Sequence, residues 1–284
     1  MKKIHILKSR WEPDDIAYMR RQGVQVKEGT TAISSARIED DDVYYDVKNR
    51  FERKYNGFVE FLYYEYTREE ILSAPYCLLV RTLHFAGYPR PLNSYMSKTF
   101  DMSNACPSCH MGRNQKGPFR IAKVAKSGFW QFYAWEPSVF FVSDMIYESV
   151  FANYGIERIP VKRTSGEIVE GFSQLVFPVS SEPLDLYAYE YEICPNCGKK
   201  RFLPGEFVNH PYFPLHNTPL RGGYAVKEVF GQGWIVSQPI LLSAELIAML
   251  IELKEIDCSL LIPCTSNIEQ YWGPKSDYSV NHPK

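Results

Sequence analysis

Several features that mark common classes of protein are missing from this chain of 284 residues. It has no apolar run of about 18 residues, the shortest that crosses a membrane as a helix. Near the N-terminus, Lys8, Arg10 and Glu12 interrupt the apolar residues, so no signal-peptide core forms. The 32 basic residues balance 33 acidic ones, which gives no general attraction for nucleic acid or an anionic membrane. We therefore expect a cytoplasmic protein with no membrane partner.

Sequence motifs of catalysis are also missing. There is no nucleophile elbow, no HExxH zinc-protease motif and no phosphate-binding glycine loop. One loop, which carries His210 and His216 close to Pro211 and Pro214, could hold an enzyme site if a deep polar pocket lies there. We expect no enzyme, and keep this loop as the weaker alternative.

Cysteine is scarce, with seven residues, and a disulfide framework is not expected in the cytoplasm. Three cysteines are isolated, namely Cys77, Cys258 and Cys264. The other four form two CxxC pairs, in which two intervening residues place both thiols on one tight turn. Two such pairs complete the shell of one tetrahedral metal. The sequence therefore predicts a structural zinc site, closed to water, with these ligands: Cys106, Cys109, Cys194 and Cys197.

Two alternatives to this zinc site stay open. The pairs are separated by 84 residues (194 − 109 − 1), which is long for a compact zinc ribbon, although the entropic cost of closing a loop rises slowly with its length. A redox-active pair is the rival, but neither CxxC directly follows a strand and opens a convincing helix. His110, next to Cys109, could replace a thiolate, and we read it as an exposed turn residue.

The N-terminal part, residues 1–100, predicts an α+β region. Strand, short helix and strand alternate over residues 3–8, 12–21 and 24–27, and again over 57–66, 67–74 and 76–81. The second helix begins with a capping box, Thr67 followed by Glu70. The acidic run of residues 39–42 lacks the spacing of a calcium loop, so we interpret it as a solvated turn.

Residues 101–270 predict a second domain, built from two similar units. Each unit has a cysteine pair at the head of a hairpin and, further on, a strand ending in Val-Ser, a helix and a strand ending near a proline. In the first unit these marks are Val142-Ser143 and Pro160, and in the second Val236-Ser237 and Pro263. The zinc site would join the two units, and residues 271–284 would form a flexible tail.

This order of motifs resembles the bacterial double-CxxCG immunity proteins of polymorphic toxin systems. The matching features are the first CPxC, the strand, Val-Ser and helix, Gly155-Ile156, Pro160-Val161 and the later CPxCG, over residues 103–265. His110 departs from the family, which tends to have Gly at this position. The resemblance implies zinc ligands at the four paired cysteines and a cognate protein toxin as partner.

The alternative function is that of a zinc-ribbon protein with a nucleic-acid-binding or regulatory role. Lys199, Lys200 and Arg201 follow the second cysteine pair directly, and Arg113 lies close to the first. Basic residues beside a metal knuckle are what such a ribbon would carry, and binding would then weaken steeply with salt.

Overall fold

The computed structural model describes residues 1–29, 33–55, 58–123, 128–132, 135–203, 210–215 and 221–273. Contacts divide the chain into two compact units. Met1–Thr67 and Val208–Pro211 form the N-terminal unit, and Arg68–Phe207 with Tyr212–Lys284 form the double-knuckle unit. The chain mixes helices and strands, as the α+β prediction has it, and the two units are described in turn.

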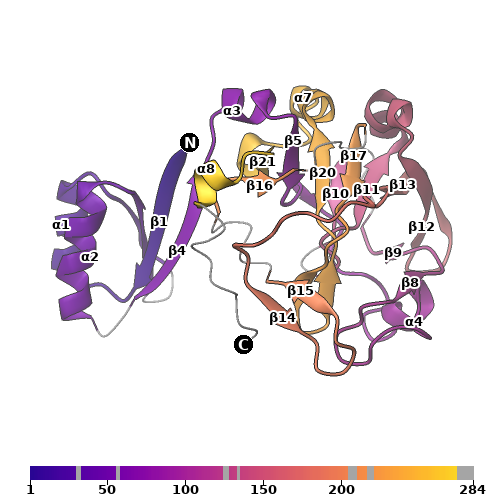
Figure 1. Cartoon of the computed structure of the whole chain (residues 1–284), viewed down its shortest axis with the longest axis horizontal. Coiled ribbons are helices and arrows are strands. Elements are labelled where there is room, and N and C mark those ends of the chain that lie inside the picture. The colour runs from indigo at the N-terminus through magenta and orange to yellow at the C-terminus, as the bar shows by residue number, and fades with distance from the viewer. Residues whose placement is uncertain are drawn as a thin grey trace. The chain divides into compact units, whose positions relative to one another are not determined.

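The N-terminal unit is a four-stranded antiparallel sheet in the order β2-β3-β1-β4, with two helices on one face (Figure 1). Its elements follow the β-α-β-β-α-β arrangement known as a split βαβ fold. They are β1 (Lys2–Ser9), α1 (Pro13–Arg21), β2 (Gln25–Lys27), β3 (Ser34–Glu39), α2 (Asp42–Lys54) and β4 (Val59–Glu65). Leu7 of the sheet and Val47 and Phe51 of α2 belong to its core and are fully buried.

The acidic run forms the start of α2 rather than a solvated turn alone. The Asp41 side chain accepts a hydrogen bond of 3.1 Å from the Tyr44 backbone N–H, which caps the helix, and Glu39 is the last residue of β3. A carboxylate at this position also interacts favourably with the helix dipole. The sequence pattern did not predict this helix.

The double-knuckle unit begins earlier than the predicted second domain, because residues 68–100 supply strands to its sheets. Its first half contains α3 (Arg68–Ser73), β5 (Tyr76–Leu79), β6 (His84–Phe85), α4 (Tyr95–Thr99), β7 (Phe100–Asp101), β8 (Asn114–Gln115), β9 (Arg120–Ile121), β10 (Phe129–Gln131), β11 (Phe140–Ser143), α5 (Asp144–Ile146), η1 (Tyr147–Phe151), η2 (Ala152–Tyr154) and β12 (Glu157–Arg163).

The second half of this unit runs from β13 to the end of the described chain. It contains β13 (Ile168–Val176), β14 (Tyr191–Ile193), β15 (Lys200–Phe202), β16 (Phe213–Pro214), β17 (Gly223–Ala225), β18 (Phe230–Gln232), β19 (Ile235–Ser237), β20 (Ile240–Ser243), α7 (Ala244–Glu252), η3 (Cys258–Leu260), β21 (Leu261–Thr265) and α8 (Glu269–Trp272). The first two residues of the predicted tail, Tyr271 and Trp272, are the last two residues of α8, and Trp272 is buried. Residues 274–284 lie outside the described residues.

The two large sheets of the double-knuckle unit share one topology. The first has the order β6-β10-β11-β13-β12-β9 and the second β16-β21-β5-β20-β17. In each, the strand before the helix and the strand after it flank an antiparallel middle strand, and a short parallel strand lies at one edge. The parallel pairing of β6 with β10 also has a counterpart, the bridge between Val179 and Ala225. The strand topology therefore recurs, with residues 76–163 as the first repeat and residues 168–265 as the second, and these repeats are longer than the units predicted within residues 101–270.

The repeats exchange their middle strands. β5 precedes the first cysteine pair in the chain, yet it pairs with β20 and β21 of the second repeat and lies among orange strands in Figure 1. β13 precedes the second pair, yet it pairs with β11 and β12 of the first repeat. Each sheet therefore takes its middle strand from the other repeat.

One detail of the predicted repeat is wrong. Ser237 ends β19, and the helix begins at Ala244 with Ser243 as its cap, whose hydroxyl accepts from the Leu246 N–H at 3.4 Å. The equivalent residue in the first repeat is Ser143, which precedes α5 after an equally buried strand. The difference arises because the buried run Ile240–Ser243 pairs as a strand with both β17 and β5, so the helix can begin only after it.

Candidate metal centre

The first cysteine pair lies on a tight turn between two short strands, β7 and β8, as the predicted knuckle requires. The Cys106 N–H donates to the Met111 carbonyl at 2.9 Å, and the His110 N–H donates back to the Cys106 carbonyl at 2.9 Å. These two backbone bonds close the turn, so both thiols are presented on the same side.

The second cysteine pair repeats the same turn 88 residues later, between β14 and β15. The Cys194 N–H donates to the Lys199 carbonyl at 3.0 Å, and the Gly198 N–H donates to the Cys194 carbonyl at 2.8 Å. Each donor and acceptor is the residue equivalent to that in the first knuckle, so the two turns are copies of each other.

All four sulfur atoms converge, and they lie within 4.8 Å of one another. Cys106 Sγ is 3.7 Å from Cys194 Sγ, and Cys109 Sγ is 3.7 Å from Cys197 Sγ. Four sulfurs at about 2.3 Å from a tetrahedral metal would be about 3.8 Å apart, so the spacing fits one ion and is too long for disulfides. The sequence placed each of these residues in the site, and the structure brings them together as a group that could hold a metal.

Backbone N–H groups stabilise the thiolate form of the first cysteine in each knuckle. Backbone N–H groups of Cys109 and Ser108 lower the pKa of Cys106, and those of Asn196 and Cys197 lower the pKa of Cys194 to about 6. Burial acts in the opposite direction on Cys109 and raises its pKa. Because metals bind thiolates, the lowered pKa values favour binding at neutral pH.

His110 occupies a backbone position that favours glycine. Its φ is 57°, in the left-handed region, and Gly198 has the equivalent φ of 67°. A side chain in this conformation costs roughly 1 to 2 kcal/mol. His110 is not among the grouped metal ligands. Its Nδ1 atom is buried without a hydrogen-bond partner among the described residues, and its ring lies 6.1 Å from the ring of Trp234.

Apolar side chains cover the centre. Met111 and Val236 are buried against the cysteines, and Val229 packs on the same cluster. Across the two turns, the Asn196 amide donates to the Ser108 hydroxyl. The dry surroundings strengthen the attraction between thiolates and a cation.

The basic cluster beside the second knuckle is largely engaged. The Arg201 guanidinium pairs with Glu192 at 2.7 Å, and the Lys200 ammonium lies 3.8 Å from the centre of the Tyr191 ring. Arg113 pairs with Glu136 at 2.7 Å. Of the predicted basic residues, Lys199 has no ion pair within the part of the chain that the structure describes.

The predicted histidine loop is described only in part. His210 belongs to the N-terminal unit, and His216 lies outside the described residues. A polar pocket of about 680 Å³ does lie against Pro214 and Leu215.

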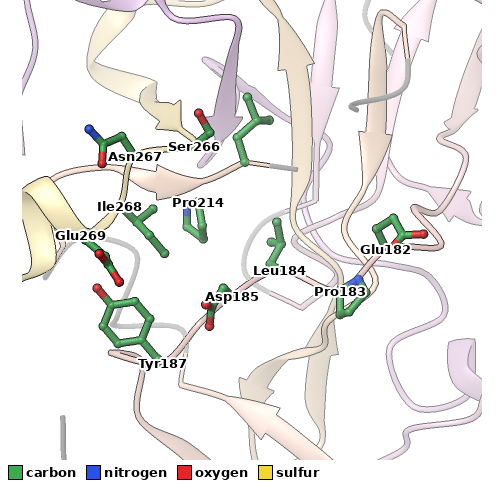
Figure 2. A pocket seen from close by; sticks show the side chains of 11 residues that line it. Glu182, Pro183, Leu184, Asp185, Tyr187, Pro214, Ser266, Asn267, Ile268 and Glu269 are labelled. Carbon is green, nitrogen blue, oxygen red and sulfur yellow. The ribbon is translucent and has the colours of Figure 1, made fainter. Parts of the chain in front are cut away.

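Figure 2 shows this pocket, with Glu269 and Tyr187 facing each other on one side and Glu182 on the opposite side. Asp185 is its third acidic residue, and its described lining contains no histidine, cysteine or lysine. The carboxylates alone assign no reaction to it.

No protein-family model matches the chain, and no curated protein matches it. Among the described residues, no helix has the length and apolar character needed to cross a membrane.

Proposed function

We propose that the chain is a zinc-stabilised, non-enzymatic binding protein that neutralises a cognate protein toxin in the cytoplasm. The observation that carries the proposal is the convergence of two copies of one knuckle on a single four-thiol centre. Its support comes from the chemistry of that centre and from the resemblance of the motif order to double-CxxCG immunity proteins.

Zinc is the metal that the donor set favours. A tetrahedral set of four cysteines is typical of structural zinc, with iron as the other common occupant. Four thiolates fill the shell and leave no position at which water or substrate could be activated. The resident ion would supply folding energy and no catalysis, which fits a protein that acts by binding.

The nucleic-acid alternative has less support. Arg201 and Lys200 are held by the acidic and aromatic neighbours named above, and Arg113 is only 10% exposed in the wall of a pocket, so the three offer a nucleic-acid backbone few accessible charges. With a net charge of −1, the chain gains little from counterion release.

Co-expression tests the proposed function. The neighbouring reading frame would be inspected for a secreted protein, and that product would be expressed in a bacterial host alone and together with the chain. We expect growth arrest by the neighbouring product alone, growth restored by the chain, and a complex of the two purified proteins that resists salt better than nucleic-acid binding does.

A matched pair of variants completes this test. Cys194→Ser should fail to restore growth, whereas Cys258→Ser, which changes a cysteine outside the centre, should restore it fully. A chain that neither restores growth nor binds the neighbouring product in a pull-down assay would contradict the proposal. Salt-sensitive capture of RNA or DNA would favour the alternative.

A further inference from the structure

A second pocket lies beside the metal centre and is lined by both repeats. Its volume is about 290 Å³. The first repeat contributes the residues that follow Cys109 and the segment around Glu136, and the second contributes Lys199 and the β18–β19 hairpin. The lining residues are Phe100, His110, Met111, Gly112, Arg113, Glu136, Ser138, Val139, Lys199, Val229, Val236, Ser237 and Gln238.

A buried ion pair lies in the wall of this pocket. The Arg113 guanidinium donates to Glu136 Oε2 at 2.7 Å and to the Val236 carbonyl at 3.3 Å, and the Tyr95 hydroxyl donates to Glu136 Oε1 at 3.1 Å. The side chains of Arg113 and Glu136 are only 10% and 4% exposed. These contacts fix the direction of Arg113 and limit its mobility.

Lys199 supplies an ammonium group to the pocket and makes no ion pair with a carboxylate among the described residues. Its Nζ lies close to the pocket-lining Gly112, 3.4 Å from where a Cβ on that glycine would be. A Cβ at Gly112 would also come within 2.5 Å of the Asn104 carbonyl oxygen, so a glycine is required there. The ammonium therefore lies close to the backbone of Gly112, where no side chain intervenes.

Among the residues that line the pocket, cationic groups outnumber carboxylates, and the four thiols of the neighbouring centre lie outside this lining. Lys199 and Arg113 carry two positive charges against the single carboxylate of Glu136. Burial raises the pKa of Glu136, while Arg113 and the Tyr95 hydroxyl act in the opposite direction. His110 adds a polar ring whose Nδ1 has no partner among the described residues. An anionic group would find donors here that the chain itself leaves unsatisfied.

The shape and surroundings of the pocket favour a side chain over a bare ion. Apolar walls from Phe100, Val139 and Val236 would contact a short hydrocarbon stem. Trp234, which is 38% exposed, lies beside His110, and its ring is 5.6 Å from that of Trp135. Tryptophan and arginine are both enriched in the hot spots of protein interfaces.

We propose that this pocket binds an acidic side chain of the protein partner, with the carboxylate paired to Lys199 and Arg113 and the stem against the apolar walls. The identity of the occupant rests on the proposed function, because a toxin-binding protein needs such an anchor site. The carboxylate chemistry rests on the pocket alone. Because both repeats line the pocket, it also depends on the metal centre that joins them.

Small probes test the carboxylate site without a toxin. N-acetylglutamate N-methylamide would be titrated into the zinc-loaded full chain and followed by the indole N–H resonances of Trp234 and Trp135, with the isosteric glutamine probe as the neutral control. We expect the glutamate probe to bind at least about tenfold more tightly, the equivalent of one charge-assisted hydrogen bond. Equal binding of the two probes, or binding of neither, would overturn the proposal.

Variants then locate the site. Lys199→Ala should weaken the glutamate probe about tenfold, whereas Lys116→Ala, which removes the same charge from an exposed residue outside the pocket, should leave its affinity unchanged. Equal effects of the two variants would contradict a specific site. Arg113→Lys keeps the charge opposite Glu136 but loses the fixed fork, and should weaken binding without unfolding.

Three further outcomes test the source of the carboxylate and distinguish failure of the anchor site from failure of the proposed function. Free glutarate that bound more tightly than the peptide-like probe would overturn the assignment to a side chain. A toxin neutralised equally well by wild type and Lys199→Ala would overturn the anchor while the proposed function stands. Probe binding lost in Lys199→Ala, in a chain that neutralises no neighbouring toxin, would support the carboxylate site and reject the function.

Discussion

Replacing Cys194 by serine should abolish metal binding and unfold most of the double-knuckle unit. Cys194 is 2% exposed, and its thiol faces the three other thiols of the centre. Structural zinc supplies about 10 to 16 kcal/mol of folding free energy in small zinc peptides, comparable with the whole stability of an ordinary domain. Even a loss of about 4 kcal/mol would lower the melting temperature by about 10 °C in a unit of this size.

Calorimetry of the reduced protein and circular dichroism measure this loss. Cys258→Ser is the matched control, because Cys258 is half-buried and lies outside the four-thiol centre. We expect a shift of a few degrees at most for this variant. A Cys194→Ser protein that melted within two or three degrees of wild type would show that the fold does not depend on the centre.

Separating the two repeats should unfold both. The expectation follows from the exchanged strands: a first fragment lacks β13, and a second fragment lacks β5. Each sheet would lose the ladder on both sides of its middle strand, and the exposed backbone and apolar faces have no other cover. A protease site in the turn of residues 164–167, between β12 and β13, makes the cut without removing a strand.

The cleaved chain should stay assembled until denaturant separates its fragments. We expect each separated fragment to lack cooperative unfolding of its repeat, and an equimolar mixture with zinc to recover it. Near-ultraviolet circular dichroism and hydrogen exchange follow the repeats, and the uncut protein with the same inserted site is the control. A fragment of either repeat that folded cooperatively alone would contradict the strand exchange.

The local features of the metal centre follow from the sequence because they depend on short-range geometry. Two residues between cysteines define the turn, and Gly198 supplies the left-handed conformation that the turn requires. The sequence could not show that the two turns meet, because 84 residues (194 − 109 − 1) separate them. Their meeting depends on the sheets that carry them. His110 shows the same limit, because its residue type conceals that it shares the backbone conformation of Gly198.

Two features of the repeats, strand β20 and the exchange of middle strands, could not be predicted from the sequence. Ile240–Ser243 is buried on both faces, and a continuous apolar run of this kind does not distinguish a strand from the start of a buried helix. The strand exchange has no signal in sequence, because β5 and β13 each lie next to their own repeat in the chain. The pairing of Arg113 with Glu136 is equally hidden, since neither residue belongs to a motif.

The metal content and ligand shell of the reduced, freshly purified chain test the central claim most directly. Elemental analysis combined with X-ray absorption at the zinc edge would count the ions and their ligands. We predict one zinc ion per chain, bound by four sulfur atoms at about 2.3 Å. A protein without bound metal, or a shell in which nitrogen or oxygen replaces two or more of the sulfurs, would contradict a single centre formed by both cysteine pairs.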